Sequence, residues 1–174
     1  MWKSVVRFVA GLSVVLAGIG VLIVAGMRRK WPPVLDTVRR LNRRTKPLVL
    51  TSAGNQGAYA SVVKHTGRTS GRSYETPVVV AATEDGFVIA LPYGSNTDWL
   101  KNVCASGSAT VVTEGQTYEV DRPAIVPIEE ATPYFRATEQ RLHRQFGVAD
   151  CLRVRSVKDR EAGPTSEEAV TGAV

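Results

Sequence analysis

Residues 64–77 carry the side chains of this chain that are best suited to binding a ligand. Gly67 and Gly71 allow positive φ and a close approach of a ligand to the backbone. Arg68 and Arg72 supply planar guanidinium groups, which bind phosphate or carboxylate through paired N–H donors. Short hydroxyl donors surround them, namely Thr66, Thr69, Ser70 and Ser73. The segment is typical of an anion-binding loop, although an ordinary polar connection between two strands has a similar composition.

The composition also favours an anionic partner. The 174 residues include 22 Lys and Arg against 16 Asp and Glu, which gives a net charge of +6. Such a chain attracts a phosphorylated cofactor, nucleic acid or an anionic membrane surface, and its length suits one domain with tails. Cys104 and Cys151 have neither metal-site nor disulfide spacing and fit a reducing compartment. Since His65 and His143 are the only histidines, we predict no metal site.

The N-terminal region is expected to be a membrane anchor. Residues 8–27 hold no charged side chain, and twenty helical residues span about 30 Å, the hydrocarbon thickness of a bilayer. A secretory signal is the alternative, but its apolar core is about 7–15 residues long and no clear cleavage site precedes Arg28. More basic residues follow the run than precede it, which places the rest of the chain in the cytoplasm. We therefore predict residues 1–30 as the transmembrane anchor of a single-pass cell-membrane protein.

Residues 31–57 are expected to form an amphipathic basic helix followed by a linker. Apolar residues recur at helical spacing at positions 34, 35, 38 and 41, and the opposite face is rich in arginine. Because this face directly follows the expected membrane span, we assign it to anionic head groups and predict no nucleic-acid partner. Residues 51–57 hold Ser, Gly, Asn and Gln, which are typical of a linker.

Residues 58–157 read as short strands separated by turns, the pattern of a small β-barrel. Strands are expected at 59–64, 76–83, 86–91, 108–113, 116–120, 124–128 and 152–155. Two helices interrupt them: one at 98–105 with Thr97 as N-cap, and one at 134–146, which follows Pro133. Residues 158–174 are mainly Gly, Pro, Ser, Glu and Ala and are expected to be a disordered tail.

Several motifs of this region resemble those of one family. They are His65-Thr-Gly-Arg-Thr-Ser-Gly-Arg72, Thr76-Pro77, Asp85-Gly86, Ala90-Leu-Pro-Tyr-Gly94 and Trp99-Leu-Lys-Asn102. Over roughly Tyr59 to Pro127 the chain resembles the deazaflavin (F420)-dependent nitroreductase family of actinobacteria. The resemblance implies an α+β, mainly β fold. This fold would be a split β-barrel of the FMN-binding, flavin-reductase-like type with two or three helices, here preceded by one N-terminal transmembrane helix.

The resemblance also implies a cofactor site for the 8-hydroxy-5-deazaflavin coenzyme F420, whose tail carries a phosphate and several glutamates. The implied residues are Arg68, Thr69 and Ser70 at the tail; Tyr74, Thr76, Pro77, Val78 and Val79 along the cofactor; Ala90, Leu91, Pro92 and Tyr93 at the ring; and Asp98, Trp99 and Asn102 on the other side. Relatives often carry Ser-Lys-Gly-Gly where this chain has Pro92-Tyr93-Gly94-Ser95. The lysine of that motif is absent here, and Tyr93 is a candidate to stack on the ring in its place.

The activity implied by the resemblance is hydride transfer from reduced F420 to an electrophilic acceptor. The expected membrane anchor favours a quinone as acceptor, with a nitro compound as the other candidate. Tyr93, Tyr134 or bulk water would supply the proton. Two alternatives stay open: a non-catalytic F420 carrier or storage protein, and an FMN-binding split-barrel oxidoreductase. Split barrels commonly pair, so the resemblance is also compatible with a homodimer.

Overall fold

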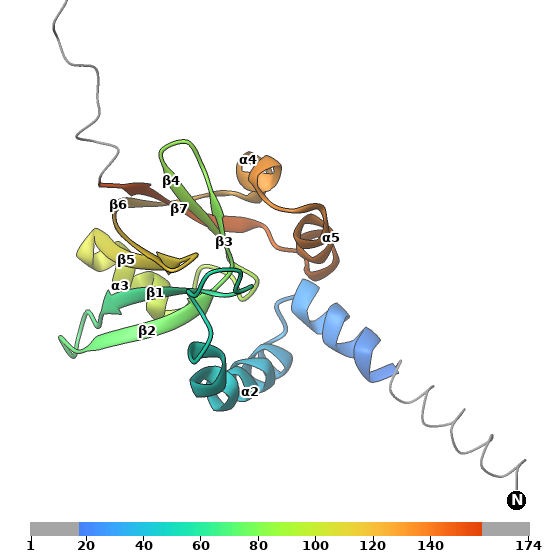
Figure 1. Ribbon diagram of the computed structural model, residues 1–174. Coiled ribbons are helices and arrows are strands. Elements are labelled where there is room, and N and C mark those ends of the chain that lie inside the picture. Colours follow the sequence, from blue (N-terminus) through green and yellow to red (C-terminus); the bar gives the residue numbers. More distant parts are fainter. Residues whose placement is uncertain (1–17, 158–174) are drawn as a thin grey trace, which may run out of the picture.

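The computed structural model describes residues 18–157 (Figure 1). Residues 18–28 are helical and are followed by α2 (Pro32–Leu50). The strands are β1 (Ser61–Thr66), β2 (Ser73–Val78), β3 (Val80–Ala82), β4 (Gly86–Ala90), β5 (Ser108–Thr113), β6 (Gln116–Pro127) and β7 (Asp150–Ser156). The other helices are α3 (Asp98–Ser106), α4 (Ile128–Ala131), the 3-10 helix η1 (Thr132–Tyr134) and α5 (Ala137–Phe146). The tail predicted at 158–174 lies outside the described residues.

The seven strands form one antiparallel sheet in the order β2-β1-β5-β6-β7-β4-β3. Its two edge strands, β2 and β3, are consecutive in the chain and are separated only by Val79. The sheet must therefore curl until its edges approach each other, which makes it a half-barrel, as Figure 1 shows. Pro77 lies on the edge strand β2, where the missing N–H costs no ladder hydrogen bond on the outer side.

Alternating apolar residues fill the concave side of the sheet. Val63, Val111 and Leu152 are each 1% exposed and belong to the main core, and Leu100 and Val103 of α3 pack among them. Strand β4 is buried on both faces, because Phe87 and Ile89 join this core whereas Val88 joins a second one. The second core lies around α4 and includes residues that follow η1 and that precede β7; its members are Ala81, Val88, Ile128, Ala131, Phe135, Val148 and Cys151. These two cores fix the rigid frame on which the loops sit.

The fold class expected from the sequence is wrong in its transmembrane helix and in its number of helices. Within residues 18–157, no helix has both the length and the apolar character needed to cross a bilayer; residues 8–17 of the expected span lie outside the described part. The predicted single-pass membrane localisation is therefore wrong as well. Instead of two or three helices, the mostly-sheet half-barrel carries α2, α3, α4, η1 and α5, besides helical residues 18–28.

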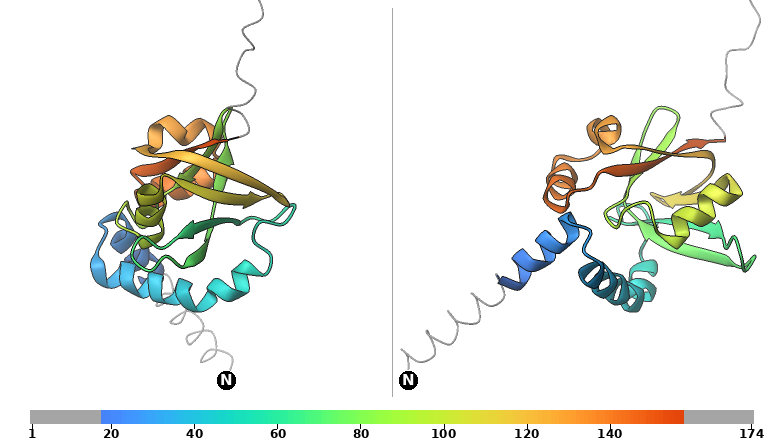
Figure 2. Two further views of the ribbon diagram at one scale, coloured as in Figure 1. Left: turned by 90° about the vertical axis from the view of Figure 1, so that its left-hand side faces the viewer. Right: turned by 180° about the vertical axis from the view of Figure 1, so that it is seen from behind.

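Local packing closes the helical residues 18–28 at the end of the apolar run. Lys30 adopts a left-handed φ of 51°, and the Trp31 N–H bonds the Gly26 carbonyl at 2.8 Å, which closes the helix before Pro32. Gly26 is buried against Val34 of α2, whose Cγ2 would lie 2.5 Å from an added Cβ. The end of the run is thus used for packing against α2. Figure 2 shows helical residues 18–28 projecting from the half-barrel and α2 lying alongside it.

Candidate active site

One large cleft of about 1400 Å³ lies between the strands, α2 and α5. All fifteen residues predicted to bind the cofactor line it: Arg68, Thr69, Ser70, Tyr74, Thr76, Pro77, Val78, Val79, Ala90, Leu91, Pro92, Tyr93, Asp98, Trp99 and Asn102. They come from the β1–β2 loop, β2, the end of β4 with the following loop, and α3. Tyr134, the second candidate proton donor, lies on η1 and does not line the cleft, and Arg72 does not line it either.

The β1–β2 loop is held by its own hydrogen bonds. The Gly67 N–H donates to the Arg72 carbonyl and the Gly71 N–H donates to the Gly67 carbonyl, both at 2.8 Å. Gly67 is closely packed, because a Cβ there would lie 2.4 Å from Ser70 Oγ and 2.7 Å from the Tyr74 ring. Ser70 Oγ also lies 3.1 Å from the Tyr74 hydroxyl. The loop is therefore a compact, preformed structure.

A buried polar network connects this loop to α3. Asn102 is 6% exposed, and its Oδ1 accepts hydrogen bonds from the Arg68 backbone N–H at 3.1 Å and from Arg68 Nη1 at 2.9 Å. Arg68 Nη2 also pairs with Asp98 Oδ1 at 3.1 Å. The Asp98 side chain is 86% exposed, so this ion pair contributes little stability. Asn102 is the buried residue that, together with Asp98, orients the guanidinium at the cleft.

The same network fixes the tautomer of His65. Arg68 can only donate, so Asn102 must turn its oxygen toward Arg68 and its NH2 toward His65 Nδ1, which lies 3.2 Å away. Nδ1 therefore accepts, and the proton on Nε2 donates to Thr76 Oγ1 at 3.1 Å. Burial first, and then the charge of Lys46, lower the pKa of His65 below its usual 6.5. His65 is thus a neutral structural residue beneath the cleft.

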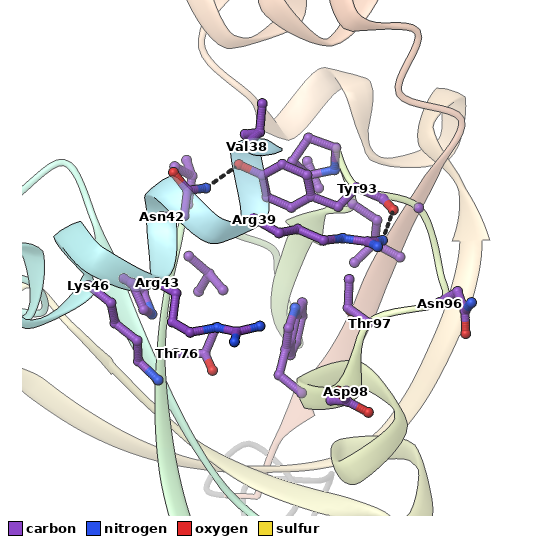
Figure 3. Close-up of a pocket in the computed structure, with 18 of the residues that line it drawn as sticks. Val38, Arg39, Asn42, Arg43, Lys46, Thr76, Tyr93, Asn96, Thr97 and Asp98 are labelled. Atoms are coloured by element: carbon purple, nitrogen blue, oxygen red, sulfur yellow. Dashed lines mark hydrogen bonds between the residues drawn. The ribbon is translucent and has the colours of Figure 1, made fainter. Parts of the chain in front are cut away.

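Helix α2 forms a wall of the cleft that sequence reasoning missed. Arg39 Nη2 donates to the Tyr93 carbonyl at 3.3 Å, and just before the helix Lys30 Nζ donates to the Pro92 carbonyl at 2.9 Å. The Asn42 amide donates to the Tyr93 hydroxyl, as Figure 3 shows. The sequence interpretation assigned this arginine-rich face to lipid head groups, but in the structure it borders the cleft. The sequence shows the basic helical periodicity of α2, but it does not show that the basic face of this helix lies beside the loop of Pro92 and Tyr93.

Tyr93 is therefore held at both its carbonyl and its hydroxyl. Burial raises the pKa of the Tyr93 phenol above its usual value, against smaller lowering effects of the Asn42 hydrogen bond and the Arg39 charge. The phenol is protonated at neutral pH. Because the Asn42 NH2 donates into the phenol oxygen, the phenol hydrogen stays available to an acceptor.

Several apolar side chains line the cleft on the side of α5, where Glu139 and His143 also border it. The apolar ones are Ile23 and Met27 of the first helical segment, Leu142 and Phe146 of α5, and Val148. Within the described chain, no group of His, Cys, Asp and Glu side chains is arranged to hold a metal ion. The cleft thus combines cationic, hydrogen-bonding side chains with apolar ones.

Comparisons with known proteins give only remote likenesses. No family model matches the chain, and no curated protein matches it either. Among solved structures, it is similar to an Agrobacterium tumefaciens protein of unknown function, at 15% identity and a TM-score of 0.43, over 56% of this chain and 48% of the other. It is also similar to a domain-swapped dimer at 12% identity and a TM-score of 0.47, over 68% of this chain and 99% of the other.

A third similar structure is an F420 reductase, at 12% identity and a TM-score of 0.40, over 57% of this chain and 86% of the other. This chain spans about half the length of the first of these proteins. Likenesses this remote carry no functional conclusion, so function must be argued from the residues of the cleft.

Proposed function

We propose that this protein is an oxidoreductase that binds reduced coenzyme F420 and passes a hydride from it to an electrophilic acceptor, a quinone or a nitro compound. The observation that carries the proposal is the donor set of the cleft. Five Lys and Arg side chains line it against three Asp and Glu side chains. The cations belong to two different walls, because Arg68 precedes β2 and the other four, Arg39, Arg40, Arg43 and Lys46, belong to α2.

The residues present fit such a cofactor in size and in chemistry. Ligand pockets are commonly about 300–1,000 Å³, and a cleft of about 1400 Å³ leaves room for a cofactor and an acceptor together. Thr97 Oγ1 at the edge of the cleft is buried and has no hydrogen-bond partner in the described structure. It is an available donor and acceptor for a bound ligand. The tail of F420, with its phosphate and glutamates, matches cations on two walls better than the single phosphate of FMN does.

When F420 is bound in its reduced form, it supplies a hydride at C5 of the deazaflavin. The chain's own residues bind and orient. Arg68, positioned by Asn102, would hold the phosphate, and the weak exposed pair with Asp98 would give way to it. Trp99, which packs against the main core, and Pro92 would border the ring. The apolar side chains on the side of α5 would exclude water from the acceptor.

Tyr93 is the proposed proton donor. Its phenol is protonated at neutral pH, and its oxygen is held by Asn42 so that its hydrogen can point into the cleft. Hydride and proton together complete the two-electron reduction of a quinone or nitro group. Tyr134 lies on η1 and is not among the cleft-lining residues, so we assign the role to Tyr93.

The test is turnover by the full-length protein under anaerobic conditions. Reduced F420 is mixed with a soluble quinone analogue or a nitroaromatic compound, and the return of the oxidised deazaflavin absorbance is followed. The proposal predicts catalysed oxidation of F420 with at least one acceptor class. Tight F420 binding without turnover would instead support a carrier or storage protein, and turnover with FMN alone would support an ordinary flavin enzyme.

A further inference from the structure

Within residues 18–157, three cations of α2 line the cleft without an acidic partner, namely Arg40, Arg43 and Lys46. Arg39 is paired with Asp36 at 3.4 Å and also bonds the Tyr93 carbonyl. Arg43 and Lys46 line the cleft, yet within residues 18–157 no ion pair or hydrogen bond engages either side chain. Such side chains on an exposed helix face would be ordinary, but these two border a large cavity.

Arg43 and Lys46 lie near the polar network that Asn102 forms with Arg68 and His65. Lys46 is close enough to His65 for its charge to lower the pKa of that histidine. Figure 3 shows Arg43 and Lys46 extending from α2 on the side of Thr76, the residue that accepts the His65 hydrogen bond. Arg68 approaches the same network from the β1–β2 loop through Asn102. The cleft is thus bounded by cations on two sides of one buried network.

Unpaired like charges that face the same partly enclosed space repel one another, and the repulsion grows as water is displaced. An anion placed between the two walls removes this repulsion and gains charge-assisted hydrogen bonds on both sides. The site therefore suits an extended polyanion better than a compact anion. A ligand with several anionic groups can place one group against each wall, whereas a single phosphate has only one group to place.

We propose that α2 is the second wall of an anion-binding site, in which Arg43 and Lys46 bind the carboxylates of a polyanionic ligand tail. This inference rests on the proposed function. In this arrangement, Arg68 binds the phosphate of F420, and Arg43 and Lys46 bind the carboxylates of the glutamates that follow the phosphate. Helix α2 is thereby a determinant of tail recognition, and the length of the tail governs affinity through these two residues.

The inference is tested by fluorescence titration of the full-length protein with two ligands. One is F420 with its glutamate tail, and the other is the deazaflavin chromophore that lacks phosphate and glutamates. The variants are Arg43→Gln, Lys46→Gln and the double substitution. Arg44→Gln is the matched control, because Arg44 has the same charge on the same helix but does not line the cleft. The exposed or half-exposed positions of these residues favour folded variants, which circular dichroism verifies.

We expect each single substitution to raise the Kd for F420 about fivefold to tenfold, and the double substitution to raise it about 50-fold, as lost charge-assisted contacts do. Binding of the tail-free chromophore should stay unchanged in all variants, and Arg44→Gln should behave as wild type. If wild type binds F420 but Arg43→Gln and Lys46→Gln bind it as Arg44→Gln does, the inference is wrong and the proposed function stands. If wild type binds neither ligand, both are wrong.

Discussion

Replacement of Asn102 by alanine tests whether the buried polar network holds the cleft in shape. The side chain is 6% exposed; it accepts two hydrogen bonds from Arg68 and donates one to His65. Alanine leaves His65 Nδ1 and the Arg68 backbone N–H without these partners. An unpaired buried polar group costs about 1–3 kcal/mol, and a lost hydrogen bond about 1 kcal/mol more. We therefore expect Asn102→Ala to lower the free energy of unfolding by about 3 kcal/mol.

Thermal unfolding of the full-length protein, followed by circular dichroism, measures this loss. In a chain of this length 1 kcal/mol shifts the melting temperature by about 2–4 °C, so the expected fall is about 6–12 °C. Asn96→Ala is the matched control, because Asn96 lines the same cleft but is exposed, and it should change stability by less than about 0.5 kcal/mol. Equal melting temperatures for the two variants would refute the role assigned to the network.

Three further predictions follow from the site and the sheet. The lowered pKa of His65 means that the unfolded chain takes up a proton first as pH falls below about 6.5. The melting temperature should therefore drop between pH 7 and pH 5, and His65→Gln should flatten that drop; an unchanged slope would contradict it. Tyr93→Phe should lower kcat about 100-fold with unchanged cofactor Kd, whereas Tyr134→Phe, outside the cleft, should leave kcat unchanged; equal effects would exclude Tyr93 as proton donor. Gly86→Ala should destabilise by about 3 kcal/mol, since its Cβ would lie 2.2 Å from the Val154 carbonyl oxygen; a near-normal denaturation midpoint would show that β4 and β7 can separate.

Residues that line the cleft could be picked out from the sequence because their local chemistry marks them. The glycines, arginines and hydroxyls of residues 64–77 mark a loop, and the Trp99 to Asn102 spacing sets one face of a helix. The family resemblance led us to expect these residues in one site. In the structure, all fifteen line the same cleft. Their binding of F420 stays a prediction.

The role of α2 could not be predicted in the same way. An amphipathic basic helix has the same periodicity whether its charged face meets lipid, water or a ligand. The hydrogen bonds from α2 to Tyr93, across more than fifty residues of sequence, show where that face lies.

Some predicted boundaries of strands and helices were wrong because contacts with distant residues, which the local sequence does not show, decide where these elements begin and end. The sequence divides β6 at Asp121 to Pro123, yet β6 runs on through an irregularity there because both halves pair with β7. The helix expected from Tyr134 begins at Ala137, since η1 ends at Tyr134 and Phe135 turns into the second core. The transmembrane expectation rested on composition alone, and within residues 18–157 no helix has the length and apolar character that it required.

The most direct test of the central claim is a fluorescence titration of the full-length protein with F420 and, separately, with FMN. Arg68→Ala removes the guanidinium held at the cleft, and Arg72→Ala removes one from the same loop that does not line it. We predict micromolar or tighter binding of F420, preferred over FMN, with a Kd raised at least about tenfold by Arg68→Ala, the effect of about 1.4 kcal/mol. Arg72→Ala should bind as wild type does. Preference for FMN, or F420 binding that is indifferent to Arg68, would contradict the account.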